Sequence, residues 1–319
     1  MPREPLDVVV VGGANTDYLV RGRSLPTPGS TVEGDEFAEG VGGKGVNQAV
    51  AAARLGASVA FVGRVGSDPR GRTLLCRLAE ERVRITGVVE DPEAPSGVAL
   101  VMVNRQGEKQ ILTAPGANRK LSVRDIAAAG ELIASARVVL SQLEVPLDAV
   151  EAAVRLGRAG GARIVLDPAP PRELPGELLR RVHVIRPNAV EAEVLTGIKV
   201  VDQRSAKKAG EDLIRRGVDA AVIGAPGGNL LVTPEGDLWL PHLRVEVVDT
   251  TGSGDAFAAA LAVCVARGED LPGAARFANA ASAMKATKLG AQSGLPTRDE
   301  VLELLSRTDN LTIAGVTES

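Results

Sequence analysis

Aromatic residues and histidines are scarce in this chain, and each shortage excludes a class of protein. Aromatics make up 2% of the 319 residues, too few for the stacking platforms on which single-stranded nucleic acid binds. The only histidines, His183 and His242, lack ligand-spaced partners, so neither a zinc site nor a histidine-based triad is expected. The net charge of −3 offers no basic field for nucleic acid or an anionic membrane.

Cysteines and long apolar runs are also few. Cys76 and Cys264 each fall inside an apolar helical run, which indicates two buried free thiols and a reducing compartment. The first apolar run, residues 6–11, is interrupted by Asp7 and is too short for a signal peptide. No later run is long enough to cross a bilayer. We therefore expect a cytoplasmic protein that binds neither membranes nor nucleic acid.

What the chain does contain is an alternation of strand and helix patterns. Short apolar runs predict strands at 8–11, 59–62, 138–141, 163–166, 182–185, 220–223 and 245–248. Helical stretches lie between most of them, including 46–55 and 71–83. Such alternation implies a mostly parallel sheet with helices on both faces, that is, a three-layer α/β/α fold.

Two segments interrupt this rhythm. Residues 17–40 alternate apolar and polar side chains around a Pro-Thr-Pro-Gly turn, and residues 97–113 form a hairpin pattern that turns at 104–107. We interpret them as a small β-sheet lid inserted in an α/β core made of residues 1–16, 41–96 and 114–308. The polar tail at 309–319 has no period and is expected to fray.

The segment from Asp249 to Asp255 reads Asp-Thr-Thr-Gly-Ser-Gly-Asp and precedes a long helical run. The amides of Gly252, Ser253 and Gly254 would stand at a helix N-terminus, which favours an anion. Asp255 would place a carboxylate beside that anion pocket, as a base for phosphoryl transfer requires. The alternative is a helix-capping aspartate after an ordinary tight turn.

Further polar residues follow predicted strands, where ligands bind in parallel sheets. Asn15 and Asp17 suit recognition of a vicinal diol, or else an Asx turn. Asn188 and Glu191 suit either a helix capping box or the orientation of water around a phosphate-bound Mg²⁺.

The segment from Gly40 to Gly45 matches G-x-G-x-x-G but follows an acidic stretch, so it lacks the context of a dinucleotide fingerprint. Lys44 is followed by glycine, so it is not a Walker A loop either. We interpret the segment as a glycine loop that approaches a small polar ligand, with Lys44 and Asn47 as donors; the alternative is a plain turn.

Together these stretches resemble the ribokinase/fructokinase (PfkB-type) family of carbohydrate kinases, from Val8 to about Leu305. The motifs that carry the resemblance are Gly12–Asp17, Pro26–Gly29, Gly42–Ala49, Gln142–Glu144, Asp167–Pro170, Pro187–Glu191 and Asp249–Asp255. The resemblance implies the family's three-layer fold with a β lid. It also implies ATP-dependent phosphorylation of the 5-hydroxyl of D-ribose, giving D-ribose 5-phosphate and ADP.

Specific roles follow from motif positions. The resemblance implies that the sugar is held by Asn15, Asp17, Gly42, Gly43, Lys44, Asn47 and Glu144. It implies Asp255 as the base and Gly252, Ser253 and Gly254 as the anion hole. Asn188 and Glu191 would serve phosphate and Mg²⁺, the latter through water, and the nucleotide would contact Gly224, Gly227, Gly228, Gly254 and Asn279. A monovalent cation, usually potassium, would bind the Asp249 carboxylate and the carbonyls of Thr251, Lys285, Lys288 and Gly290. The lid sheets of two copies would form a homodimer.

Three departures from the family pattern stand out. The loop from Gly224 to Gly228 is one residue shorter than usual and lacks a threonine; Gly294 replaces a common polar ligand; and Lys285 replaces a small apolar residue. Two alternatives remain. One is a related kinase for deoxyribose, a ketohexose or a nucleoside, and the other is a sugar-binding regulator without phosphotransfer, suggested by the altered loop.

Overall fold

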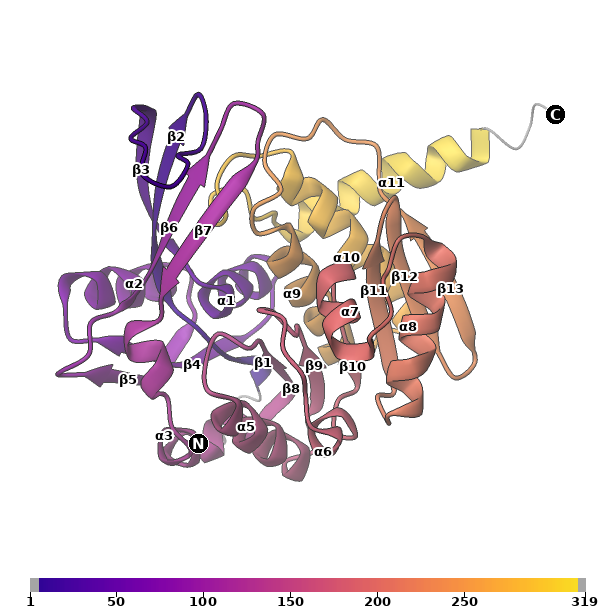
Figure 1. Ribbon diagram of the computed structural model, residues 1–319. Coiled ribbons are helices and arrows are strands. Elements are labelled where there is room, and N and C mark those ends of the chain that lie inside the picture. The colour runs from indigo at the N-terminus through magenta and orange to yellow at the C-terminus, as the bar shows by residue number, and fades with distance from the viewer. Residues whose placement is uncertain (1–5, 315–319) are drawn as a thin grey trace.

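The computed structural model describes residues 6–314, and side chains as far as residue 307. Its main sheet has nine strands in the order β13-β12-β11-β10-β9-β8-β1-β4-β5 (Figure 1). The strands are β1 (Leu6–Val11), β4 (Val59–Gly66), β5 (Arg84–Asp91), β8 (Ala136–Ser141), β9 (Arg163–Leu166), β10 (Val184–Ile185), β11 (Ala220–Ala225), β12 (Gly228–Thr233) and β13 (Gly236–Pro241). All neighbouring strands from β5 to β11 pair in parallel, whereas β12 pairs antiparallel with both of its neighbours, β11 and β13.

Helices cover both faces of this sheet. One apolar cluster joins the strands to α1 (Lys44–Arg54), α2 (Pro69–Glu80), α9 (Ser253–Ala266), α10 (Leu271–Ala286) and α11 (Arg298–Ala314). The other joins them to α3 (Val123–Ala128), α4 (Gly130–Ala134), α5 (Leu147–Ala159), α6 (Gly176–Leu179), α7 (Ala189–Thr196) and α8 (Gln203–Arg215). Alternate residues of β1 enter opposite clusters, because strand side chains alternate between faces. The predicted three-layer fold is confirmed.

A second sheet of four strands stands apart from the main one, at the upper left of Figure 1. Its order is β3-β2-β6-β7, built from β2 (Asn15–Gly22), β3 (Gly34–Gly42), β6 (Gly97–Val103) and β7 (Lys109–Ala114). The predicted small separate sheet is thus confirmed. A 3-10 helix, η1 (Gly116–Lys120), follows β7. The division of the chain into core and lid domains stays a prediction.

Helix α9 lies at the centre of the molecule. Every residue from Asp255 to Ala266 is buried, and most of them are small. A helix that is apolar on all sides is stable only when other elements surround it, and α9 contacts α1, α10, β1, β8 and β9. It begins after Gly252, whose φ of 82° lies in the left-handed region that favours glycine. The start of α9, and with it Asp255, is therefore held by the whole core.

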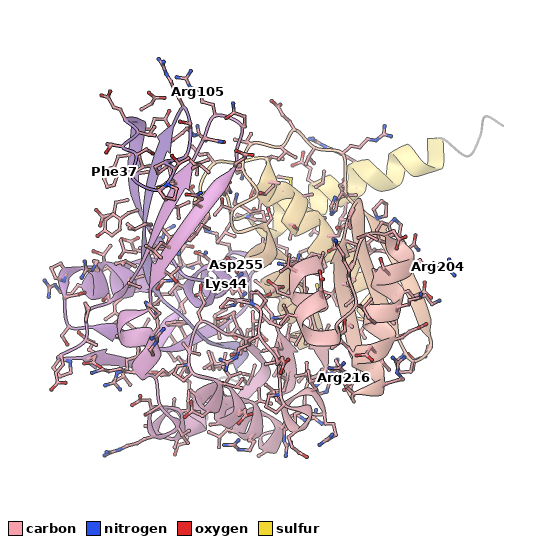
Figure 2. All side chains as sticks on the ribbon, viewed as in Figure 1. Phe37, Lys44, Arg105, Arg204, Arg216 and Asp255 are labelled. Carbon is pink, nitrogen blue, oxygen red and sulfur yellow. The ribbon has the colours of Figure 1, made fainter. Side chains whose placement is uncertain are left out.

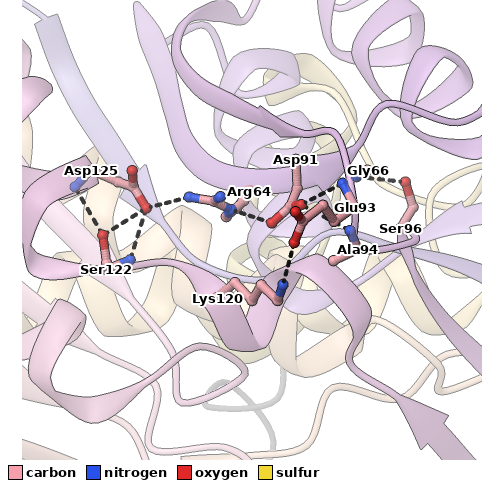
Figure 3. Close-up of polar contacts among 9 residues, drawn as sticks. All are labelled: Arg64, Gly66, Asp91, Glu93, Ala94, Ser96, Lys120, Ser122 and Asp125. Carbon is pink, nitrogen blue, oxygen red and sulfur yellow. Dashed lines mark hydrogen bonds and ion pairs between the residues drawn. The ribbon is translucent and has the colours of Figure 1, made fainter.

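The segment that leads from β5 into the lid is fixed by an ion-pair network (Figure 3). Arg64 on β4 donates from Nε to Asp91 and from Nη1 to Asp125, at 2.9 Å in each case. Asp91 also accepts the amides of Ala94 and Glu93, and these hydrogen bonds lower its pKa to about 2. The carboxylate is therefore ionised at neutral pH, and it holds the loop against the edge of the core.

Several local predictions differ from the structure. The expected strand at 245–248 is not formed, and β12 and β13 make the edge of the sheet instead. Cys76 is exposed on α2, whereas Cys264 is buried as expected. Helix α11 continues to Ala314, into the segment expected to fray, and the rest of that segment, 315–319, lies outside the described residues. Within residues 6–314 no helix is long and apolar enough to span a membrane.

Candidate active site

Glycines allow two chain segments, residues 12–15 and 43–45, to meet where β1 ends. A Cβ atom on Gly45 would lie 2.7 Å from Gly12 C and from Gly13 O, closer than real Cβ atoms approach. Gly43 has a φ of 88°, and its Cβ position is 2.7 Å from the amide nitrogen of Asn15. The last three residues of the glycine loop therefore press α1 against the end of β1. This contact positions the side chains of the first turns of α1.

Asp255 lies at the meeting point of α9 and α1, and the residue is only 5% exposed. Its Oδ2 accepts from Asn47 Nδ2 at 3.0 Å, and its Oδ1 accepts from Gln48 Nε2 at 3.2 Å. Lys44 Nζ stands 3.9 Å from Oδ1. Figure 2 shows Lys44 and Asp255 together in the middle of the molecule. The carboxylate is thus held in one orientation by amide donors, with one ammonium group near it.

The hydrogen-bond network continues to residues that the sequence did not single out as ligands. Gln48 Nε2 also donates to Asp167 Oδ2 at 2.8 Å, and its Oε1 accepts from Gln142 Nε2 at 2.6 Å. Lys44 Nζ is 3.7 Å from the same oxygen of Asp167. The other oxygen of Asp167 is buried without a hydrogen-bond partner. Helical spacing could have indicated Gln48 as a site residue, because it follows Lys44 by one turn of α1 and so lies on the same face of the helix.

Burial and neighbouring charges shift the pKa values of Asp255 and Lys44. Burial raises the pKa of Asp255, the Lys44 ammonium opposes the rise, and the Asp167 carboxylate adds to it. For Lys44, burial lowers the pKa, but the carboxylates around it, led by Asp167 and Asp255, hold it above its usual range. A lysine that remains ionised and a carboxylate with a raised pKa suit a site where a proton is accepted near developing negative charge.

On the lid side, Asn118 clamps the predicted sugar ligand Asn15. Asn118 Nδ2 donates to Asn15 Oδ1 at 2.8 Å and to Ala14 O at 2.9 Å, and its Oδ1 accepts from Ala14 N at 2.8 Å. Asp17 extends over Gly42, where an added Cβ would lie 2.1 Å from the carboxylate. The sequence did not predict a role for Asn118, because nothing near it indicates that η1 packs against the residues that follow β1.

Two predicted sugar ligands are acids with raised pKa values. Burial, and then the Asp255 carboxylate, raises the pKa of Asp17 to about 6. Burial raises the pKa of Glu144 to about 7 against the opposing effect of Lys44. Glu144 accepts from the amide of Lys44 at 2.8 Å. The mutual repulsion among Asp17, Glu144 and Asp255 means that these carboxylates, brought together from β2, the end of β8 and α9, face one shared site.

The expected anion hole stands at the start of α9 with a guanidinium group beside it. Ser253 Oγ is buried without a hydrogen-bond partner. Arg186 lies 5.0 Å from the centre of the Phe257 ring, and its Nη1 would be 3.1 Å from a Cβ on Gly254. The N-terminus of α9 and the Arg186 guanidinium both favour negative charge at this point. Arg186 was not predicted, although it immediately precedes the Pro187–Asn188 motif.

Asn188 and Glu191 form a capping box at the start of α7. Asn188 Oδ1 accepts the amides of Val190 and Glu191, both at 2.9 Å, and Glu191 Oε2 accepts the amide of Asn188 at 2.8 Å. The capping interpretation is therefore confirmed. Burial, and then the Asp167 carboxylate, raises the pKa of Glu191, so a second pair of acids faces the site. The Mg²⁺ and phosphate role of Asn188 and Glu191 stays a prediction.

The predicted nucleotide residues lie around β11 and β12. The loop from Gly224 to Gly228 is a tight turn centred on Pro226 and Gly227, the latter with a φ of 84°. Gly224 donates its amide to Pro187 O at 2.9 Å, which places the turn beside the start of α7. Asn279 accepts from Asn229 Nδ2 at 3.0 Å and donates to Pro241 O at 2.8 Å. Its side chain ties α10 to β12 and β13, and its nucleotide role stays a prediction.

The expected potassium site does not fit a free cation, because an ammonium group already contacts its donors. Lys285 Nζ donates to Asp249 O at 2.8 Å and to Lys288 O at 3.1 Å. The Asp249 carboxylate accepts the amides of Thr251 and Gly290 and contacts Lys109 Nζ at 3.1 Å. These hydrogen bonds outweigh burial and hold the pKa of Asp249 well below its usual range. Lys285 thus occupies the position at which potassium was expected.

Comparison with known proteins places this site within a known class of enzyme. Residues 5–298 match the family described as pfkB family carbohydrate kinase. The chain belongs to this family, and it is therefore an enzyme that transfers a phosphoryl group to an alcohol.

Individual relatives cover nearly the whole chain. A ribokinase of Haemophilus influenzae is 37% identical over 93% of this chain and 98% of its own length. A deoxyribokinase of Salmonella typhi is 33% identical over 94% of this chain and 99% of its own. The structure is similar to that of Arabidopsis thaliana ribokinase complexed with ribose and ATP, with a TM-score of 0.85, 31% identity, and coverage of 94% and 99% of the two chains.

Proposed function

We propose that the protein is a cytoplasmic kinase that transfers the γ-phosphoryl group of ATP to the 5-hydroxyl of D-ribose, giving D-ribose 5-phosphate and ADP. The observation that carries the proposal is the buried Asp255 carboxylate at the start of α9, next to the helix N-terminus formed by Gly252, Ser253 and Gly254. Several relatives described as ribokinases support the choice of sugar.

In the proposed reaction, Asp255 accepts the proton of the 5-hydroxyl as that oxygen attacks the γ-phosphorus, while the bond to the ADP oxygen breaks. The amides of 252–254 and the Arg186 guanidinium take up the charge that develops on the transferred group. Asn47 and Gln48 keep the carboxylate aimed at the hydroxyl, since both donate to it. The protein thus contributes position and charge, which is most of what phosphoryl transfer needs.

Magnesium fits the acidic side of the site. Asp167 Oδ1 is buried without a partner, and the Glu191 carboxylate faces Asp167 closely enough to raise its pKa. Mg²⁺ prefers oxygen ligands and retains waters, so Asp167 and Glu191 would hold it, Glu191 through water. When bound, the ion neutralises phosphate charge. Asn188 and the turn at Gly224, Gly227 and Gly228 would lie along the nucleotide, with Gly254 at its phosphates.

For the sugar, we assign the binding role to the acids and amides that face the lid. Asp17 would accept hydrogen bonds from the two hydroxyls of a vicinal diol. Asn118 orients Asn15 so that its side chain also faces the sugar. Gly42 and Gly43 allow the lid strand to approach, while Lys44, Asn47 and Glu144 border the other side. A deoxyribose kinase is the second candidate, favoured by the similarity to the Salmonella typhi enzyme.

The direct test is ADP release with Mg-ATP across a panel of D-ribose, deoxyribose, ketohexoses and nucleosides. We expect D-ribose to give the highest kcat/KM, because deoxyribose offers Asp17 an incomplete diol. A preference for deoxyribose or a nucleoside would overturn the substrate assignment and leave the reaction type. Ribose binding without any ADP release would instead indicate a sugar-binding regulator.

The acids near the sugar predict how activity depends on pH. Asp17 and Glu144, with pKa values of about 6 and about 7, are ionised acceptors above those values and protonated below them. Because kcat/KM reports groups of the free enzyme, we expect kcat/KM for ribose to fall roughly tenfold or more from pH 8 to pH 5. Glu144→Gln should remove the inflection near 7 and keep the one near 6. A flat profile in the wild-type enzyme would contradict the assignment.

We also propose that the lid sheets of two copies pair to form a homodimer. By strand register, Val20 lies opposite Phe37 and Leu100 opposite Leu112. Leu100 pairs with Tyr18, two residues from Val20 on β2, so all four share one face. Phe37 is 65% and Leu112 67% exposed, and Figure 2 shows Phe37 on the lid, away from the core. A contiguous apolar face of this kind favours a matching surface, and a second lid supplies one.

The substitution Phe37→Lys tests this pairing, because it places a charge on the shared apolar face, at the edge strand β3. We expect light scattering after gel filtration to give a dimer for the wild type and a monomer for the variant. Val201→Lys is the matched control, since Val201 is 57% exposed but lies far along the chain from the lid, between α7 and α8. A wild-type monomer, or a Phe37→Lys dimer, would count against the lid as the interface.

A further inference from the structure

Lys285 is a fully buried lysine near the anion hole. It lies in the last turn of α10, and its side chain is 0% exposed. Its Nζ donates to two backbone carbonyls, Asp249 O at 2.8 Å and Lys288 O at 3.1 Å. Carbonyl oxygens next to a carboxylate form the kind of shell that surrounds a bound monovalent cation. Here the positive charge in that shell belongs to the chain itself.

The space for this side chain comes from Gly294. A Cβ added at position 294 would lie 2.9 Å from Lys285 Cδ and 3.1 Å from Lys285 Cε. A side chain at position 294 would crowd the stem of the buried lysine, which would have to shift. The two unusual residues that the sequence places at 285 and 294 therefore act as a pair: one supplies the cation and the other supplies the room for it.

Three more of the oxygen ligands expected for potassium, Lys285 O, Gly290 O and the Asp249 carboxylate, already have hydrogen-bond partners. Lys285 O accepts the amide of Lys288 at 3.2 Å, and Gly290 O accepts the amide of Gly294 at 3.3 Å. The Asp249 carboxylate is contacted by Lys109 from the lid, in addition to the amides of Thr251 and Gly290. A free cation would have to displace several of these hydrogen bonds and stand next to two ammonium groups, which repel it.

The cluster also touches the catalytic element. Asp249 and Thr251 lead directly into α9, and a Cβ on Gly252 would be 2.8 Å from Ala291 O. Residues 288–291 thus pack against the backbone of the anion hole, and Lys285 joins them to Asp249. Loss of the ammonium would leave the carbonyls of Asp249 and Lys288 unpaired and would loosen both segments.

We propose that the ammonium of Lys285 takes the place of a monovalent cation, so that this enzyme reaches full activity without potassium. The activity part of this inference rests on the proposed kinase function, whereas the binding part does not. Lys285 is a positioning residue in this role: it holds the anion hole through Asp249 and Lys288 and does not touch the substrate.

Kinetics in KCl and in tetramethylammonium chloride at equal ionic strength test the proposal. The wild type should give the same kcat, within about twofold, in both salts. Lys285→Ala should lose roughly tenfold in tetramethylammonium, the usual effect of losing a charge-assisted hydrogen bond, and recover in KCl, because the vacated space admits K⁺. Lys285→Met keeps the apolar stem in that space and should not recover. Arg276→Met, on the exposed side of α10, is the matched control and should behave as the wild type.

Binding measured without turnover separates this inference from the kinase assignment. Melting temperature and thallium-205 NMR should reveal no saturable binding of K⁺ or Tl⁺ to the wild type and saturable binding to Lys285→Ala. Saturable activation or stabilisation of the wild type by K⁺ would overturn the proposal, and so would full activity of Lys285→Ala in tetramethylammonium. If the alanine variant does not fold, K⁺ activation and K⁺ or Tl⁺ binding measured on the wild type still test the proposal.

Discussion

Replacing Asp255 by asparagine should reduce kcat by a factor on the order of 10²–10⁴ and leave ribose affinity within a few-fold of the wild type. Asparagine preserves the shape of the side chain and can still contact Asn47 and Gln48, which hold the aspartate at 3.0 and 3.2 Å. It cannot accept a proton from the attacking hydroxyl. Steady-state kinetics and calorimetric titration with ribose measure the two effects separately.

A second buried aspartate provides the control. Asp91 is 2% exposed and belongs to the Arg64 network, away from the proposed chemistry. Asp91→Asn should keep its turnover per folded molecule, although it weakens the packing of the loop before the lid. Turnover of Asp255→Asn close to that of the wild type would remove Asp255 from the role of base. Equal losses in both variants would point to a general structural effect.

Within the glycine loop, Gly45→Ala and Gly40→Ala should have opposite outcomes. A Cβ on Gly45 would meet backbone atoms of Gly12 and Gly13 at 2.7–2.8 Å, so α1 must move outward. Since Lys44, Asn47 and Gln48 move with it, we expect kcat/KM to fall by about 10²-fold, as misplacement by about 1 Å can cause. Overpacking should also lower the free energy of unfolding by about 1–3 kcal/mol.

Gly40, the first glycine of the same pattern, is the matched control because a Cβ there meets nothing within 4 Å. Gly40→Ala should keep kcat/KM within about twofold and the free energy of unfolding within about 0.5 kcal/mol, as surface substitutions usually do. Urea unfolding and ribose kinetics on both variants measure these effects. An active Gly45→Ala enzyme would mean that the close contact between α1 and β1 does not position the site.

The layered fold was predictable because its signals are local and repeated. Apolar strands such as Val8–Val11 and small-residue helices such as α1 each carry their own pattern. The segment 245–248 shows where local signals fail: its valines favour a strand, but β13 already closes that edge of the sheet. Val247 and Val248 are 62% and 52% exposed, and the Val248 amide binds Ala286 O instead. The position at the sheet edge is taken by β13, so the strand propensity of residues 245–248 is not realised.

The site was predictable only where its residues lie inside motifs. Asp255 and Asn47 follow from sequence because glycine patterns and strand ends mark them, and the structure brings them into contact. Asn118 carries no local mark, and Arg186 borders a motif that does not indicate its approach to Gly254, since the partners of both residues lie far along the chain. Lys285 could be placed near Asp249, but the direction of its side chain depends on the space at Gly294. Such a contact cannot be read from either residue alone.

The burial of α9 has a consequence for how enzymes of this architecture diversify. The proposed base sits on a helix whose every residue from Asp255 to Ala266 is packed on all sides, so most mutations there would be eliminated with the fold. Asn15 and Asp17, the residues proposed to select the acceptor, stand instead on β2, whose sheet has two exposed edge strands. Substitutions in the lid can therefore change the sugar that is bound, while the proposed base on α9 and its reaction stay the same.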